Sequence, residues 1–161
     1  MIEIRTAALT DWAELADVEA ECFPPAEAAS PAALRDRLAH FPRHFWLLTI
    51  DGRVASFVNG MTTDTPDLTD EMYADAALHD ESGAWQMIFG VATHPDYQRR
   101  GCAEKLLRYV VEQARQQGRK GLVLTCKEHL LHFYGKVGFV DEGISDSTHG
   151  GAVWHKMRLT F

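Results

Sequence analysis

The sequence predicts a single α/β domain over residues 1–161, with a central mixed, mostly antiparallel sheet of about seven strands flanked by helices. Three observations predict it. The length suits one domain, and 46% hydrophobic residues suit an ordinary globular core. Strand-like and helix-like patterns alternate along the chain. The segment Ala84–Thr93 would present apolar residues on both faces of a strand, as in a strand that is covered on both sides.

The N-terminal part predicts one strand and two helices. Residues alternate over Ile2–Thr6, which is typical of a strand. A helix is expected over Asp11–Glu21, with small residues among its buried positions: Ala13, Ala16 and Ala20. The pair Pro24-Pro25 ends this helix in a rigid bend. A second helix is expected from Ser30, a good N-cap, to about His40.

The middle of the chain predicts a hairpin and an acidic insertion. His44–Ile50 and Arg53–Met61 flank Asp51-Gly52, a dipeptide that favours tight hairpin turns. The segment Thr62–Gly83 is polar and acidic, with a short helix indicated by Leu68, Met72, Ala76 and Leu78. An insertion of this length either covers a binding site or decorates the surface.

The C-terminal half predicts two helices and three strands. Apolar residues recur at three- and four-residue spacing over Gly101–Gly118, and Gly118 is a good left-handed stop. A shorter helix is expected over Glu128–Lys136. The strands are expected at Gly121–Cys126, Phe139–Glu142 and Ala152–Leu159.

Charge is distributed unevenly. The net charge is −7, which argues against a nucleic acid as the main partner. No Lys or Arg lies between Arg53 and Arg99, an interval with eight acidic residues, whereas nine of the sixteen basic residues lie from Arg99 to Lys136. One part of the chain therefore suits an anionic ligand and another suits a cationic amine, although solubility alone would also explain the pattern.

Three cysteines without Cys or His ligand spacing predict neither a disulfide framework nor a metal site. No leader pattern occurs and no apolar run approaches ~20 residues, so we expect a cytoplasmic protein without membrane contact. A homodimer paired through the last strand is compatible with the sequence.

The turn Gln98-Arg99-Arg100-Gly101 lies between the central strand and the helix that follows. A helix N-terminus offers unpaired N–H groups and partial positive charge, so this turn suits a phosphate or pyrophosphate. The alternative is a solvated basic turn before an ordinary helix.

Two motifs together carry a resemblance. Val91 with QRRGCA, and the downstream LTCKEHLLHFYGKVGF, resemble the acetyl-CoA signature and the tyrosine segment of the GNAT superfamily of N-acetyltransferases, most closely the arylalkylamine branch. The resemblance implies a GNAT-like fold with a splayed pair of central strands and acetyl-CoA as co-substrate. It places the co-substrate against one set of residues: Val91, Ala92, Thr93, Gln98, Arg99, Arg100, Gly101, Cys102, Ala103, Phe133 and Lys136.

The same resemblance makes Tyr134 the catalytic candidate, as a proton donor to the leaving thiolate. The family's strand histidines fall at Met87 and Phe89 in this sequence, so another group must take the amine proton. Three residues are candidates for that base: Glu27, Asp64 and His149. The acceptor is expected against five residues: Phe23, Pro24, Glu27, Trp85 and Met87.

We therefore expect an N-acetyltransferase that transfers acetyl from acetyl-CoA to a primary amine of a small molecule, by direct attack in a ternary complex. Two alternatives remain open. One is acetylation of a peptide or protein N-terminus, which needs an open groove. The other is a non-catalytic acyl-CoA-binding sensor.

Overall fold

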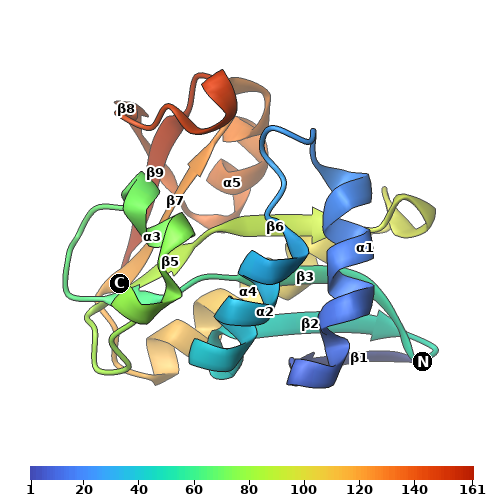
Figure 1. Cartoon of the computed structure of the whole chain (residues 1–161). Helices are drawn as coiled ribbons and strands as arrows, with labels where there is room; N and C mark the ends of the chain where they lie inside the picture. The colour runs from blue at the N-terminus through green and yellow to red at the C-terminus, as the bar shows by residue number, and fades with distance from the viewer.

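The computed structural model describes residues 1–161 and contains two groups of paired strands. The first group runs in the order β1 (Ile2–Thr6), β2 (Phe45–Ile50), β3 (Arg53–Asn59) and β6 (Gly90–Thr93). The second runs in the order β4 (Thr62–Thr63), β5 (Trp85–Ile88), β7 (Gly121–Cys126), β9 (His155–Thr160) and β8 (Val140–Ile144) (Figure 1). All pairs are antiparallel except β5 with β7. The mixed, mostly antiparallel sheet expected from the sequence is confirmed.

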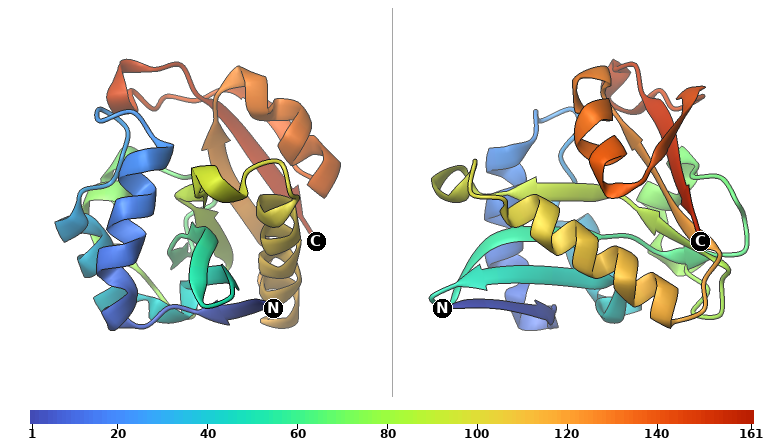
Figure 2. Two further views of the ribbon diagram at one scale, coloured as in Figure 1. Left: turned by 90° about the vertical axis from the view of Figure 1, so that its right-hand side faces the viewer. Right: turned by 180° about the vertical axis from the view of Figure 1, so that it is seen from behind.

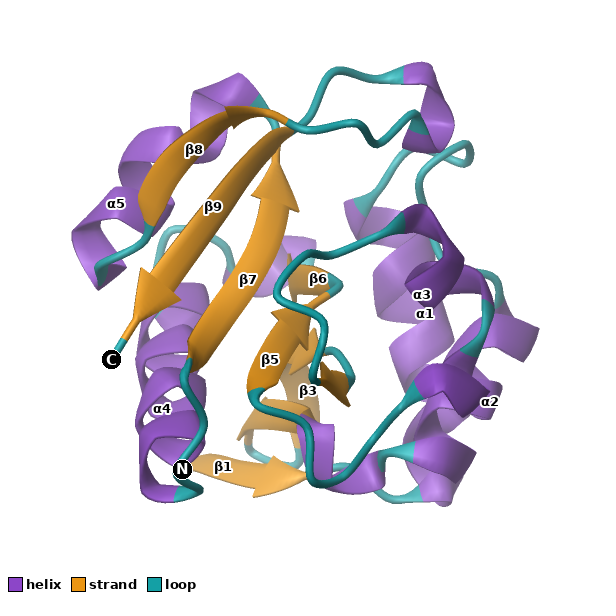
Figure 3. Cartoon of the chain, turned by 90° about the vertical axis from the view of Figure 1, so that its left-hand side faces the viewer, coloured by secondary structure: helices purple, strands orange, loops and turns teal.

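Helices cover both sides of the strands. Figure 3 shows α4 and α5 on one side, and α1, α2 and α3 on the other. Their bounds are α1 (Trp12–Cys22), α2 (Pro31–His40), α3 (Asp70–Ala74), α4 (Cys102–Gln116) and α5 (Leu131–Val137). Figure 2 shows from behind how α4 crosses the strands. The longest helix has 15 residues, and none combines the length and apolarity needed to cross a bilayer.

Strand β2 has a core on each face because α1 and α2 cover one side and α4 the other. Trp46 and Leu48 pack into the cluster that contains the apolar face of α4. Phe45 and Leu47 pack into the cluster formed with α1 and α2. Side chains alternate along a strand, so a strand covered on both faces is apolar throughout, which explains the run FWLLTI.

Helix α1 buries different residues from those expected. Leu15, Val18 and Glu19 are buried, whereas Ala13 and Ala20 are exposed. The three buried residues share one helical face, which packs toward the strands because it carries the larger apolar side chains. Of the three alanines expected to be buried, only Ala16 is half-buried against this cluster.

The Asp51-Gly52 turn joins β2 to β3 with positive φ at both residues, 50° and 83°, as a tight hairpin requires. In the acidic insertion, Leu68, Met72 and Ala76 are buried while Leu78 is 40% exposed. The insertion contributes β4, α3 and a 3₁₀ turn, and it packs onto the core beside Met87.

Gly60 lies where β3 passes close to the backbone of β5. A Cβ there would overlap the Met87 carbonyl group. We expect Gly60→Ala to lower the free energy of unfolding by about 1–3 kcal/mol or more, since backbone must move to admit the methyl group. Gly135→Ala on α5 meets open space and is expected to be neutral or to stabilise by about 0.5–1 kcal/mol. Urea denaturation of both variants checks this, and equal midpoints would contradict it.

Candidate active site

The site begins where the central strand is interrupted at Phe89. Gly90 is the register partner of Asn59, yet the N–H of Phe89 also donates to the Asn59 carbonyl at 2.7 Å. Two residues of one strand therefore oppose one residue of the other, which defines a β-bulge. Up to Ile88 the strand pairs with β7, and beyond the bulge it pairs only with β3. The splayed pair of central strands expected from the sequence is confirmed.

The backbone of Val91 is open toward the gap between β6 and β7. The His94 N–H donates to the Ala55 carbonyl at 2.8 Å. In an antiparallel ladder, residue pairs with and without hydrogen bonds alternate, so this bond shows which pairs of β3 and β6 are hydrogen-bonded. In that alternation Val91, opposite Val58, belongs to a pair that exchanges no hydrogen bonds. Its N–H and C=O therefore point away from β3, where no strand pairs with them. Such a free N–H suits an acyl carbonyl that gains negative charge.

The turn before α4 presents a run of free donors. No N–H group from Arg99 to Glu104 donates to another group of the protein, and the first that does is that of Lys105, to the Gly101 carbonyl at 3.0 Å. Arg99 and Gly101 have positive φ, 65° and 76°, and the space beside Gly101 is open. Consecutive N–H groups at a helix N-terminus form an anion site.

The remaining donor-site candidates differ in position. Gln98 donates from Nε2 to the Thr93 carbonyl at 3.4 Å, and the side chain of Cys102 is buried in the core. Ala92 is also buried and Ala103 is half-buried. Lys136 pairs with Glu104 at 2.8 Å on the surface rather than pointing into the gap.

Tyr134 lies on α5 at the edge of the gap. Its side chain packs edge-on against Phe133 and Phe139, with ring centroids 5.1 and 6.0 Å away. The residue is only 7% exposed, and its hydroxyl makes no hydrogen bond within the protein. Burial raises the pKa of this phenol, so it is a neutral hydrogen-bond donor at pH 7.

A cavity of about 320 Å³ adjoins the gap. Phe23, Phe89 and Trp154 give it aromatic walls, and Val91, Thr125 and Tyr134 mark the side where the strands separate. The Tyr73 hydroxyl reaches across to Thr125 Oγ1 at 3.2 Å. The cavity therefore lies next to the free backbone of β6 and to the phenol.

Three segments far apart in the sequence form the roof of this cavity. They are the bend after α1, helix α3, and the loop between β8 and β9. His149 Nε2 donates to the Glu27 carbonyl at 2.9 Å, and its ring stacks on Tyr73 at 5.5 Å. Asp70 accepts hydrogen bonds from Ser147 Oγ and the Thr148 N–H. Part of the acidic insertion, namely Asp70, Tyr73 and Ala74, therefore lines the cavity.

Two buried charges in the cavity are absent from the sequence-based candidates. Glu19 is 6% exposed, and one of its carboxylate oxygens accepts the Ala29 N–H at 2.9 Å. Burial is the main effect on this carboxyl and raises its pKa. Arg37 is also 6% exposed and lines the same cavity. Glu19 lies on the same helical face as Leu15 and Val18, and Arg37 lies on the same face as Leu34 and Leu38. A charged residue within an apolar helical face is the sequence signal that could have revealed both.

The other candidates for the acceptor site and the base are either paired with a charged group or lie outside the cavity. Glu27 lines the cavity but pairs with Lys127 at 2.9 Å. Pro24 is exposed, and Met87 is fully buried in the core. Trp85 lies under the Arg158 guanidinium, 4.8 Å from its ring centroid, outside the cavity. Asp64, a candidate base, accepts the Ala84 N–H at 3.0 Å and is also outside.

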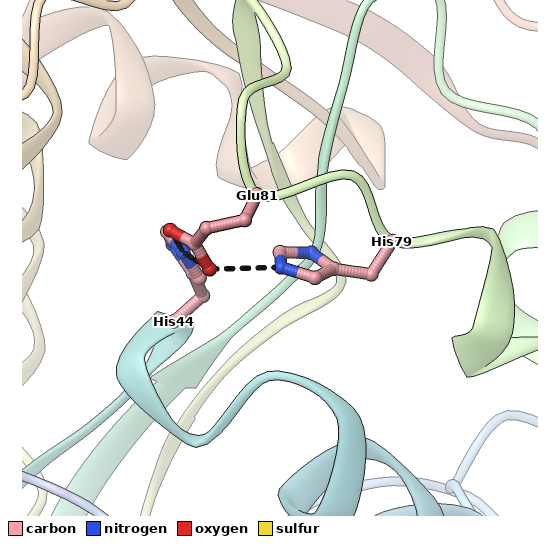
Figure 4. Close-up of side chains that lie close together, drawn as sticks. All are labelled: His44, His79 and Glu81. Carbon is pink, nitrogen blue, oxygen red and sulfur yellow. Dashed lines mark hydrogen bonds and ion pairs between the residues drawn. The ribbon is translucent and has the colours of Figure 1, made fainter.

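A second polar cluster lies away from this cavity (Figure 4). The ligand atoms of His44, His79 and Glu81 lie within 4.8 Å of one another, as in some metal sites. The Thr62 N–H donates to His79 Nδ1 at 3.1 Å, so the proton of that ring is on Nε2, which faces Glu81 at 3.1 Å. A protonated Nε2 has no lone pair for a metal. Hydrogen bonds therefore account for this cluster, which fastens the acidic insertion beside the start of β2.

Comparison with known proteins identifies the class. Residues 12–139 match the model of the acetyltransferase (GNAT) family. Serotonin N-acetyltransferase of Mesocricetus auratus is 27% identical over 98% of this chain and 77% of its own length. The chain therefore belongs to the acetyltransferase (GNAT) family. The family resemblance is confirmed, and with it an acetyl-CoA-dependent N-acetyltransferase activity.

Solved structures share the fold. A GNAT-like decarboxylase, GphF, in complex with isobutyryl-CoA has a TM-score of 0.85 at 22% identity, covering 98% of both chains. The loading GNATL domain of CurA from Lyngbya majuscula also has a TM-score of 0.85, at 16% identity, over 99% of this chain and 98% of that one. The ribosomal-protein-S18-alanine N-acetyltransferase of Escherichia coli has a TM-score of 0.74 at 20% identity, over 99% and 94%.

Two glycines at opposite ends of α4 offer a matched test of the anion site. Gly101 and Gly118 both have positive φ, 76° and 78°, and open space for a Cβ. Alanine at either position is expected to cost about 1–2 kcal/mol of stability. Only Gly101→Ala is expected to weaken acetyl-CoA binding, by about tenfold, because its methyl group enters the surface where N–H groups approach a phosphate. Isothermal titration calorimetry measures this, and equal affinities of the two variants would contradict it.

Proposed function

We propose that this acetyltransferase transfers acetyl from acetyl-CoA to a primary amine of a small molecule, by direct attack in a ternary complex. The observation that carries the proposal is the roofed cavity beside the gap. Three carboxylates line it, those of Glu19, Glu27 and Asp70, and they suit a cationic acceptor. Its aromatic walls suit an apolar body attached to the amine.

We assign the binding site of acetyl-CoA to the free N–H groups before α4 and to the open edge of β6. The pyrophosphate would meet the N–H groups of Arg99 to Glu104, and the thioester carbonyl would accept from Val91 N–H. Holding the thioester beside the cavity lets proximity supply much of the rate.

Glu19 is the group that we assign to remove the amine proton. An alkylamine has a pKa near ~10.4, so about 4 kcal/mol opposes the free base at pH 7. Among the cavity carboxylates, Glu27 pairs with Lys127 and Asp70 accepts two hydrogen bonds from the roof. Glu19 has one hydrogen bond, from Ala29, and a raised pKa, which favours proton transfer.

The reaction then balances as follows. The amine nitrogen gives a proton to Glu19 and attacks the thioester carbon. A C–N bond forms, the C–S bond breaks, and the thiolate takes a proton from Tyr134. As the amide forms, its nitrogen loses a second proton to solvent. Glu19 also releases its proton to solvent, and Tyr134 recovers one from solvent.

The roof favours a small acceptor over a peptide. An N-terminal acetyltransferase needs an open groove for the chain that follows the acetylated residue, whereas here Tyr73, His149 and Glu27 join across the cavity. A phenol with a free hydroxyl at the gap favours catalysis over a sensor that only binds acyl-CoA.

The phenol is tested by thiol release from acetyl-CoA with a panel of amines. We expect Tyr134→Phe to lower kcat by about ten- to hundredfold with little change in acetyl-CoA affinity, since the ring remains and only the proton donor is lost. Tyr109→Phe on α4, where the side chain is 37% exposed, is the matched control. Equal kcat in wild type and Tyr134→Phe would exclude the assigned role. Tight acetyl-CoA binding without release for any amine would favour a peptide acceptor or a sensor.

The base is tested by the pH dependence of kcat/KM. Glu19 must be ionised to accept a proton, so wild-type kcat/KM is expected to fall as pH is lowered through the raised pKa of Glu19. In Glu19→Gln we expect a loss of about a hundredfold at pH 7, with activity rising toward the pKa of the free amine. Asp17→Asn, an exposed acid on the same helix, is the control. An unchanged acidic limb in Glu19→Gln would overturn the assignment.

A further inference from the structure

Arg37 places a buried positive charge at the cavity. The residue lies on the inner face of α2, and its guanidinium is 4.8 Å from the centroid of the Phe89 ring. Nη1 donates to Asn59 Oδ1 at 3.1 Å and Nη2 donates to the Tyr73 carbonyl at 3.2 Å. Both acceptors are neutral, so neither compensates the charge.

The guanidinium also has unused donors. It carries five N–H groups, and its Nε is buried without any hydrogen-bond partner. Arg119 and Arg158 have similarly shielded side chains, 7% and 14% exposed, and both form ion pairs with a glutamate. Arg37 forms none. A buried cation without an opposite charge in contact is costly, and a bound anion would relieve that cost.

The carboxylate whose charge acts on Arg37 is that of Glu19. Glu19 and Arg37 each affect the pKa of the other, yet they form no ion pair, and both line the same space. A cation and an anion that face one cavity without touching match a ligand that carries both charges. The ligand's anionic group would lie toward α2 and its amine toward α1.

We propose that the acceptor is an amine that also carries a carboxylate, as a free amino acid does, with Arg37 binding the carboxylate. This inference rests on the proposed function, since it names the acceptor class of the same site. Guanidinium and carboxylate match as planar, two-pronged partners, so Arg37 acts as a specificity residue rather than a group that takes part in bond changes. The aromatic walls formed by Phe23, Phe89 and Trp154 suit an apolar side chain.

The experiment compares amino acids with the amines that lack only the carboxylate. The pairs are phenylalanine with phenethylamine, tryptophan with tryptamine, and lysine with cadaverine. The readout is the ratio of kcat/KM within each pair, which cancels effects on acetyl-CoA binding. We expect wild type to favour the amino acid by at least about tenfold in one pair or more, and Arg37→Gln to lower that ratio by at least about tenfold.

Two further variants keep the test clear. Arg35→Gln changes an exposed arginine on the same helix and is expected to leave the ratio unchanged. Arg37→Lys keeps the charge but loses the two-pronged geometry, so its ratio of kcat/KM for amino acid over amine should lie between those of wild type and Arg37→Gln. Arg37→Lys also replaces Arg37→Gln in the test if Arg37→Gln does not fold. Circular dichroism checks the folding of each.

The outcomes separate the inference from the proposed function. Turnover of the simple amines without preference for amino acids in wild type would overturn the inference and leave the proposed function intact. The same preference in wild type and Arg37→Gln would also overturn it. Turnover of no member of any pair, with acetyl-CoA still bound, would overturn both.

Discussion

One extra residue in the central strand organises the site. Phe89 and Gly90 both oppose Asn59, and this β-bulge ends the pairing of the central strand with β7. Beyond it, Val91 keeps its place beside β3 but has a free backbone on the other side. The gap and the open N–H of Val91 both depend on this interruption, so backbone geometry shapes the proposed donor site.

The acceptor side is formed differently, by charges placed where a soluble domain normally buries apolar groups. Glu19 and Arg37 occupy core-facing positions of α1 and α2, and both line the cavity without forming an ion pair with each other. Burial raises the pKa of Glu19 and lowers the pKa of Arg37, so it disfavours the charged form of each residue. In the proposed complex, a ligand that carries both charges would remove this cost, and the site would favour it over a ligand with one charge.

The fold could be predicted because its signals are local, and the proposed donor site rests on local signals as well. The turn and helix over Gly101–Gly118 form one continuous segment, and Tyr134 follows at a recognisable spacing. The positions of Trp85 and Met87 could not be predicted from the alternation of the strand. A regular alternation places both on the same face as Phe89, yet only Phe89, at the bulge, lines the cavity. Arg37 meets Asn59 and Tyr73 through contacts distant in the sequence, which no local pattern reveals.

The two halves of the site also differ in how firmly they are held. The donor edge belongs to a strand ladder and to an amphipathic helix packed on the core. The roof is joined by a few side-chain contacts, chiefly those of His149 with Glu27 and Asp70 with Ser147. Each such hydrogen bond contributes only about 0.5–1.5 kcal/mol. The roof is therefore held by fewer interactions than the β-bulge and the turn before α4.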